Sequence, residues 1–162
     1  MIIPLPPTPV TDERIVAAAQ AGGITLTAAA DLPDTPGVSA APVPQWFATL
    51  GEIPVAVTHL SEATLLIRAE TTLPETPATT ATQYSEQLPT YLAANQVNNA
   101  LPGVKTVVII EPGQPHRAGT EIEVYIGEGL TDVQLEHNLQ RGFAGVVAAV
   151  GRLTQELATE LP

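Results

Sequence analysis

The side chains best suited to acid–base or metal chemistry are three histidines and a pair of glutamates. His59, His116 and His137 are widely separated, and no two of them have the spacing of a zinc-ligand pair. We expect a hydrogen bond from His59 at a strand end, a loop position for His116 and a solvated helix position for His137. Glu121 and Glu123 would project from one strand face, where paired carboxylates can act as acid and base. Alternating charge on a wet strand face explains the pair without catalysis.

Other candidate groups for catalysis or phosphate binding are isolated. Glu111 follows a predicted strand and could join a carboxylate pair, but Ser39, Ser61 and Ser85 lie in no nucleophile-elbow motif. The glycines before predicted elements match neither phosphate-loop pattern, and Lys105 lies in a predicted strand. We therefore expect no catalytic residue, no bound metal and no cofactor.

Charge and composition limit the classes of partner. Six Lys and Arg against 17 Asp and Glu give the 162 residues a net charge of −11, which repels phosphate backbones, so nucleic acid is an improbable partner. Hydrophobic residues make up 44%, enough for a folded core despite 16 prolines. The chain has no cysteine, which excludes disulfides and thiol chemistry and fits a reducing cytoplasm.

The ends and the longest apolar segments indicate neither a signal sequence nor a membrane helix. Four prolines interrupt residues 1–9, which we expect to form an extended polyproline-like arm. No segment approaches the ~20 apolar residues that a membrane helix needs, so we expect no membrane association. Residues 10–162 are long enough for a single domain, within which the Pro- and Ala-rich residues 31–44 predict a long loop.

The periodicity of apolar residues predicts an α+β fold, with helices packed on an antiparallel sheet in the order α-β-β-β-α-β-β-α. Alternation on 63–71 predicts that Leu65, Ile67 and Ala69 share a buried face. Residues 104–110 are the most apolar short run and predict a central strand, whereas 111–119 predict a hairpin connection. The expected helices cover 10–21, 79–99 and 132–159, and the expected strands cover 24–28, 45–60 with a bend or hairpin at 51–52, 63–71, 104–110 and 120–126.

The middle helix has a complication at its centre. Pro89 either kinks this helix or starts a new one. One side of the predicted helix carries Tyr84, Leu88, Tyr91, Leu92 and Asn95.

The last helix carries the clearest local signals. Thr131 and Gln134 have capping-box spacing, and Leu130 and Leu135 occupy the hydrophobic-staple positions. A continuous apolar seam follows, made of Leu135, Leu139, Phe143, Val146, Val150, Leu153 and Leu157.

Three glycines within this helix suggest that another backbone comes close, since each costs up to ~1 kcal/mol in a helix interior. The neighbour is either the protein's own sheet or a second subunit. The aromatic pair Trp46 and Phe47 belongs either to the core or to an exposed anchor for a partner. The possible interaction surface therefore comprises Trp46, Phe47, Gly142, Gly145, Val146 and Gly151.

Three stretches of the sequence resemble the YbjN family of proposed bacterial sensory transduction regulators, whose fold is similar to that of type III secretion chaperones. They are TPVTDERI, VTHLSEATLLIRAETTLPE and IGEGLTDVQLEHNL. A weaker likeness covers YLAANQVNNALP, where Asn98 and Pro102 match the family pattern and Val97 replaces its usual Trp. The resemblance covers most of the chain outside residues 28–50 and implies a small cytoplasmic homodimer without known catalytic residues.

These observations favour a non-enzymatic regulator or chaperone-like module that presents a sheet face or a helix groove to a protein segment. One alternative is a small acidic hydrolase that uses Glu121 or Glu123 with His59 or His116. Another is a structural subunit of a larger assembly.

Overall fold

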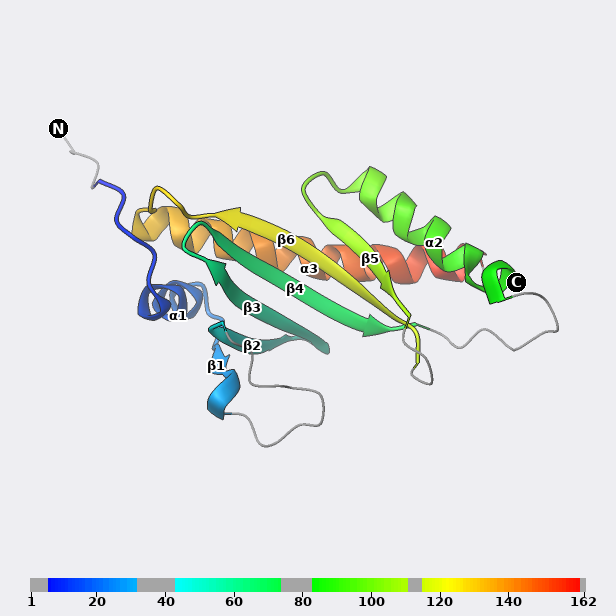
Figure 1. The fold of residues 1–162 in the computed structure, drawn as a ribbon, viewed down its shortest axis with the longest axis horizontal. Coiled ribbons are helices and arrows are strands. Elements are labelled where there is room, and N and C mark those ends of the chain that lie inside the picture. The colour runs from blue at the N-terminus through cyan, green and yellow to red at the C-terminus, as the bar shows by residue number, and fades with distance from the viewer. Residues whose placement is uncertain (1–5, 32–42, 74–82, 111–114, 161–162) are drawn as a thin grey trace. The chain divides into compact units, whose positions relative to one another are not determined.

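The computed structural model describes residues 6–31, 43–73, 83–110 and 115–160. Its strands form one sheet in the order β1-β2-β3-β4-β6-β5, which confirms the antiparallel α+β class and the predicted order of elements (Figure 1). The helices are α1 (Asp12–Ala21), α2 (Gln83–Ala100) and α3 (Asp132–Glu160), and the strands are β1 (Thr27–Ala28), β2 (Gln45–Leu50), β3 (Ile53–Ser61), β4 (Thr64–Thr72), β5 (Lys105–Ile109) and β6 (Arg117–Tyr125).

The chain divides into two compact units. The first comprises Met1–Ile67 and Glu123–Ala144, and the second comprises Arg68–Ile122 and Gly145–Pro162. Strands β4 and β6 and helix α3 therefore each contribute residues to both units.

In the first unit, α1 begins as its sequence predicts. The Thr11 hydroxyl accepts a hydrogen bond from the Arg14 N–H, at 3.4 Å, and the staple residues Val10 and Ile15 are both buried. The backbone N–H of Glu13 and then the Thr11 side chain lower the pKa of the exposed Glu13 carboxyl. The start of α1 is thus fixed by its cap and by two apolar contacts.

The Arg14 side chain holds the segment before α1 against the turn that leads into α3. Its guanidinium donates to the carbonyls of Thr8 at 2.8 Å, Pro9 at 2.6 Å and Leu130 at 2.7 Å, and it pairs with Asp132 at 2.7 Å. The backbones of Thr8 and Leu130 also bond to each other. The described part of the proline-rich arm is therefore docked on the body of the first unit.

The hairpin predicted at residues 51–52 is present between β2 and β3. Gly51 has φ 65°, a left-handed conformation that favours glycine, and the strands pair from Gln45↔Thr58 to Leu50↔Ile53. On β4, Leu65, Ile67 and Ala69 are fully buried, as their alternation predicts.

Three expectations for strands are wrong in detail. Only Thr27–Ala28 of residues 24–28 is a strand, because β1 pairs with only two residues of β2. Strand β6 starts at Arg117, within the predicted connection, because Ile109↔Arg117 already pair. Strand β5 is the edge strand, not a central one. Its apolar residues gain cover from helix α2, since Val108 packs on the core that contains α2 residues.

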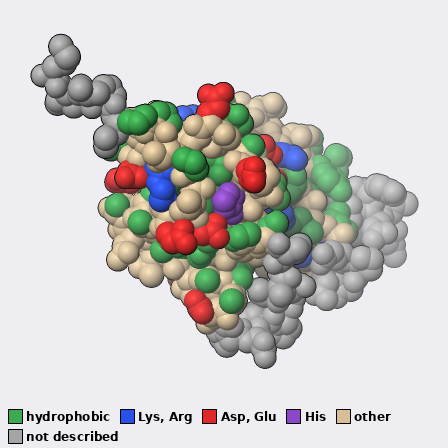
Figure 2. Space-filling view, turned by 60° about the vertical axis from the view of Figure 1, so that its left-hand side comes forward, with side chains coloured by type: hydrophobic (Ala, Val, Ile, Leu, Met, Phe, Trp, Pro, Cys, Tyr) green, Lys and Arg blue, Asp and Glu red, His purple; other side chains and the backbone are tan. Residues whose placement is uncertain are grey.

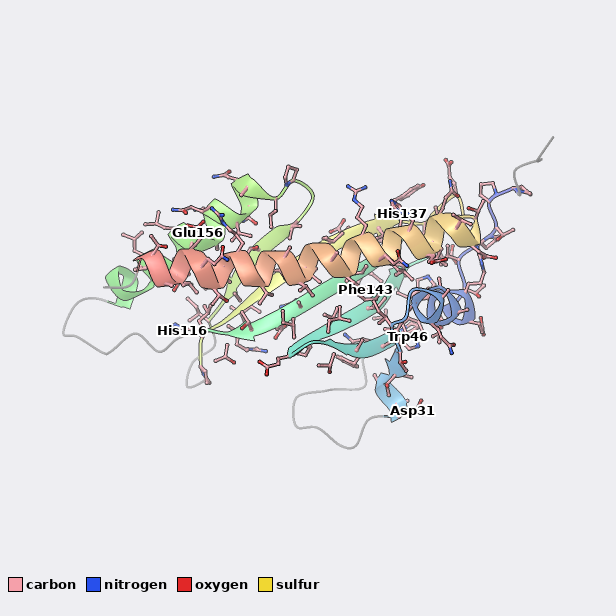
Figure 3. All side chains as sticks on the ribbon, turned by 180° about the vertical axis from the view of Figure 1, so that it is seen from behind. Asp31, Trp46, His116, His137, Phe143 and Glu156 are labelled. Carbon is pink, nitrogen blue, oxygen red and sulfur yellow. The ribbon has the colours of Figure 1, made fainter. Side chains whose placement is uncertain are left out.

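Helix α3 matches its prediction closely. The Thr131 N–H donates to Gln134 Oε1 at 2.9 Å, and the Gln134 N–H donates to the Thr131 hydroxyl at 3.2 Å, which completes the capping box. All seven residues of the apolar seam are buried. Figure 3 shows Phe143 of this seam pointing from the helix toward the sheet of the first unit.

The core of the second unit is formed by small side chains of α2 against α3 and the strands. Its buried members are Leu73, Ala93, Ala94, Val97, Ala118, Ala149, Leu153 and Leu157. Val97, which replaces the usual Trp of the resembled family, is fully buried here. Pro89 lies inside one helix, so α2 does not start at this proline.

Candidate interaction surface

The residues of the predicted interaction surface separate into buried and exposed positions. Trp46 is 7% exposed and therefore belongs to the core of the first unit. Phe47, the next residue of β2, lies on the opposite face of the strand and is partly exposed. Val146 is fully buried, and its carbonyl accepts a hydrogen bond from the Thr120 hydroxyl at 3.2 Å.

The three helix glycines also have different neighbours. A methyl group at Gly142 would clash with Ile67 Cδ1 in the first unit, and one at Gly145 would clash with Ile122 Cδ1 in the second. Both glycines thus allow α3 to approach strands of its own chain. Gly151 is exposed, and a methyl group there would have no neighbour within 4 Å.

The most apolar exposed surface among the described residues lies on α2. Leu88, Tyr91 and Leu92 are 54%, 42% and 42% exposed, and their spacing of three and four residues places them on one side of the helix. This is the side that the sequence marks as apolar, and it faces outward, away from the core formed by Ala93, Ala94 and Val97. We call these three residues the α2 stripe. The Tyr84 side chain lies outside the described residues.

The sequence of α2 carries an additional signal for this surface. Its 18 residues, Gln83–Ala100, include a single charged residue, Glu86, although the chain as a whole has a net charge of −11. A solvent-exposed helix face normally carries charged side chains opposite its core-facing side. An apolar and nearly uncharged exposed face is instead typical of the centre of a protein–protein interface.

A second notable surface, the ionic ladder, joins β4 and β6 in the second unit. Arg68 pairs with Glu70 at 2.8 Å and with Glu121 at 3.1 Å, and Glu70 also pairs with Arg117 at 2.7 Å. The Arg68 guanidinium lies directly over Gly119, where an added Cβ would be 3.0 Å from Arg68 Nη2. The missing side chain of Gly119 therefore makes room for the arginine.

The sequence predicted that Glu121 lies on a solvent-exposed strand face, but it did not predict the arginine that pairs with Glu121. Arg68 and Glu121 are 53 positions apart along the chain, and only the pairing of β4 with β6 brings them together. The signal that could have suggested the ladder is the recurrence of charge at every second position, as in Arg68 and Glu70.

The sheet face of the first unit that lies opposite the buried residues also exposes apolar side chains. Leu60 on β3 is 49% exposed and Tyr125 on β6 is 66% exposed, and Phe47 is partly exposed beside Ala56. The space-filling view in Figure 2, which brings forward the left-hand side of Figure 1, shows Asp and Glu side chains scattered over the surface, and Lys and Arg do not gather into one patch in this view. The visible surface therefore has no basic groove for a phosphate backbone.

The candidate acid–base residues have separate partners. His59 Nδ1 lies 2.7 Å from Asp12 Oδ1, which confirms the expected hydrogen bond at a strand end. The carbonyl of His116 accepts from the Leu73 N–H at 2.8 Å, just before β6 begins. His137 is exposed on α3, as predicted (Figure 3).

The glutamates of the enzyme alternative are not joined to a histidine within the described ranges. Glu121 pairs with Arg68, and Glu123 is exposed to solvent. Glu111 lies outside the described residues. Among the described residues, no group of His, Asp and Glu side chains could hold a metal ion.

A helix that crosses a bilayer must be both long and apolar, and this requirement applies to α1, α2 and α3 alike. None of them combines the necessary length with sufficient apolarity.

Solved structures that share this fold over nearly the whole chain include the following two. YbjN from E. coli, a proposed transcription regulator, is similar with a TM-score of 0.64 and 12% sequence identity over 96% of this chain and 99% of its own. An uncharacterized protein from Methanothermobacter thermautotrophicus is similar with a TM-score of 0.58 and 12% identity, over 91% of this chain and 99% of its own. No model of a known protein family matches the chain, and no curated protein matches it significantly in sequence. The similarity confirms the YbjN-like fold that the sequence motifs suggested.

Proposed function

We propose that this protein is a non-enzymatic regulator or chaperone-like module that binds protein and acts as a cytoplasmic homodimer through the α2 stripe. The observation that carries the proposal is the exposure of Leu88, Tyr91 and Leu92 on a helix with one charged residue. Apolar and aromatic residues at the centre of an interface contribute most of its binding energy. A stable dimer buries roughly 800 Å² on each partner, so the α2 stripe would be the centre of a larger contact.

The low charge of α2 makes this surface the one on which a second copy can bind with little repulsion. Two chains that each carry a net charge of −11 repel one another over most orientations. Contact through α2 brings few charges together, because Glu86 is the only ionisable acid or base within Gln83–Ala100 apart from the Tyr hydroxyls. The α2 stripe is therefore a surface on which two acidic chains can meet with little local repulsion.

The same net charge supports a protein partner for the regulator and argues against nucleic acid. A protein that neutralises several phosphates needs clustered Lys and Arg, whereas this chain has six in total. Two of these six, Arg68 and Arg117, already pair with glutamates in the ionic ladder. Regulation by this protein would then act through protein contacts, for which the apolar sheet face around Phe47, Leu60 and Tyr125 offers a binding surface.

The environment of the candidate groups supports the proposal of a non-enzymatic role. General acid–base catalysis needs a proton donor and acceptor within hydrogen-bond reach of a shared substrate position. Among the described residues, His59 is bonded to Asp12 and Glu121 is paired with Arg68, so each of these candidate groups already has a partner within its own unit. A structural subunit of a larger assembly would use the same exposed surfaces, and co-purifying partners would distinguish it from a free regulator.

The homodimer is tested by changing the α2 stripe and measuring molar mass by light scattering over a range of protein concentrations. We expect the unmodified protein to be a dimer and Leu92→Glu to be a monomer, because a buried unpaired carboxylate at an interface is strongly unfavourable. Val133→Glu is the matched control, since Val133 is 75% exposed on α3. Circular dichroism checks that each variant is folded. A monomeric unmodified protein at all concentrations would contradict the dimer.

A further inference from the structure

Strand β5 lies at an edge of the sheet, and its composition is suited to unwanted pairing with another strand. It is the last strand in the sheet order, and its five residues, Lys105–Ile109, include three consecutive β-branched apolar residues. An edge strand presents backbone N–H and C=O groups to any other strand that approaches, and apolar β-branched edges are the most prone to pair. Such an edge needs a feature that blocks it.

The hydrogen bonds of Thr106 identify which backbone groups of β5 point outward. The Thr106 N–H donates to Asn98 Oδ1 at 2.6 Å, and Asn98 Nδ2 donates to the Thr106 carbonyl at 3.1 Å. Because both groups bond to α2, the pair Thr106↔Thr120 is one that exchanges no backbone bonds across the ladder. Alternation then places the N–H and C=O of Val108, two residues on, at the same outer edge.

The Asn98 amide thus occupies the place of a residue in a neighbouring strand. One N–H of its Nδ2 group bonds the carbonyl of Thr106 and its Oδ1 bonds the N–H of Thr106, as the C=O and N–H of an added strand would. Its position is fixed because the preceding residue, Val97, is fully buried in the core of the second unit. Lys105, which precedes Thr106 in the strand, is exposed, and lysine on an edge strand discourages pairing with another strand.

We propose that Asn98 closes the outer edge of β5 at Thr106 and thereby hinders β5 of a second copy from pairing with it. A second copy is the expected pairing partner because it carries the same β-branched strand. Two identical edge strands can pair antiparallel around a two-fold axis. This contact is separate from the α2 stripe, since it involves the backbone of β5 rather than the outward side chains of α2. It is independent of whether the protein is a dimer.

The test compares Asn98→Ala with Asn99→Ala, which changes the exposed neighbouring asparagine on the same helix. Light scattering should show that Asn98→Ala forms larger species than the unmodified protein as concentration rises, whereas Asn99→Ala does not. Adding Val108→Pro to Asn98→Ala should reduce this association, because proline removes one of the two outward N–H groups, that of residue 108, without removing a bond to β6. Folded Asn98→Ala that keeps the size of Asn99→Ala at every concentration would overturn the proposal.

Hydrogen exchange on the unmodified protein tests the same proposal without a variant that could fail to fold. The Thr106 amide should exchange about tenfold or more slowly than the Val108 amide, although both lie at the same edge, because only Thr106 is bonded to Asn98. Equal exchange of the two amides would show that Asn98 does not close the edge, whatever the state of the α2 stripe.

Discussion

At the scale of single residues, arginines organise the polar contacts of both units. Arg14 donates hydrogen bonds to three backbone carbonyls and pairs with one carboxylate. The five donors of a planar guanidinium make this number of contacts possible. Arg68 joins two glutamates across strands while it lies over a glycine. In an acidic chain with six Lys and Arg, these two cations each compensate several acceptors.

The Arg14 contacts predict a large effect of one partly buried side chain. Arg14→Ala should lower the free energy of unfolding by on the order of 2 kcal/mol, because its carbonyl and carboxylate acceptors lose charge-assisted hydrogen bonds. Arg14→Lys should recover only part of this, since a single ammonium cannot reach all four acceptor groups. Urea denaturation measures both changes.

The control for this prediction is Arg141→Ala, which removes an exposed cation from α3. Its effect should be small, as for most exposed charges. If Arg14→Ala were as mild as Arg141→Ala, the docking of the proline-rich segment through Arg14 would not contribute to stability.

At the scale of elements, the glycines of α3 provide a matched comparison of packing and helix propensity. Gly142→Ala should lower the free energy of unfolding by about 1–2 kcal/mol, because its methyl group meets the fully buried Ile67. Gly151→Ala should raise it by roughly 0.5–1 kcal/mol, since alanine favours the helix and has open space there. Thermal unfolding of both variants measures whether each substitution lowers or raises the free energy of unfolding. A stabilising Gly142→Ala would mean that Ile67 can move aside at little cost.

The elements differ in how far the sequence could predict them, and α3 shows the favourable case. Its cap, formed by Thr131 and Gln134, and its apolar seam are local patterns, so its start at Asp132 and its buried side were both predicted correctly. The β2–β3 hairpin was also predicted correctly, because its turn signal lies between two adjacent strand patterns. Elements whose signals lie within a few residues of one another can be predicted from one sequence.

Helix α2 and strand β5 show why the rest could not be predicted. The apolar run of β5 has the composition of a central strand, but its position at the edge depends on which strands pair, and that information is not local. On α2 the core accepts the small residues Ala93, Ala94 and Val97, and the larger Leu88 and Tyr91 stay outside. The periodicity identifies the apolar side without indicating which neighbour covers it.

At the scale of the whole molecule, the net charge of −11 sets how self-association should depend on salt. If two copies meet through the α2 stripe, the attraction is apolar and the opposing term is long-range repulsion between acidic chains. Added salt shortens the screening length from ~30 Å at ~0.01 M to ~10 Å at ~0.1 M, so it weakens the repulsion and leaves the apolar contact intact. Dimerisation through α2 should therefore strengthen with salt.

We expect the dimer dissociation constant to fall by roughly threefold or more between ~0.01 and ~0.1 M salt, as measured by sedimentation equilibrium. Val133→Glu should show the same trend, and Leu92→Glu should stay monomeric at both concentrations. The opposite dependence, a dimer that salt dissociates, would indicate an interface held by ion pairs.

The ionic ladder is the surface that could form such an interface. It carries both signs of charge on Arg68, Glu70, Arg117 and Glu121, so two such faces could pair, and salt would weaken that contact. The sign of the salt effect thus decides between the α2 stripe and the ionic ladder as the place where two copies meet.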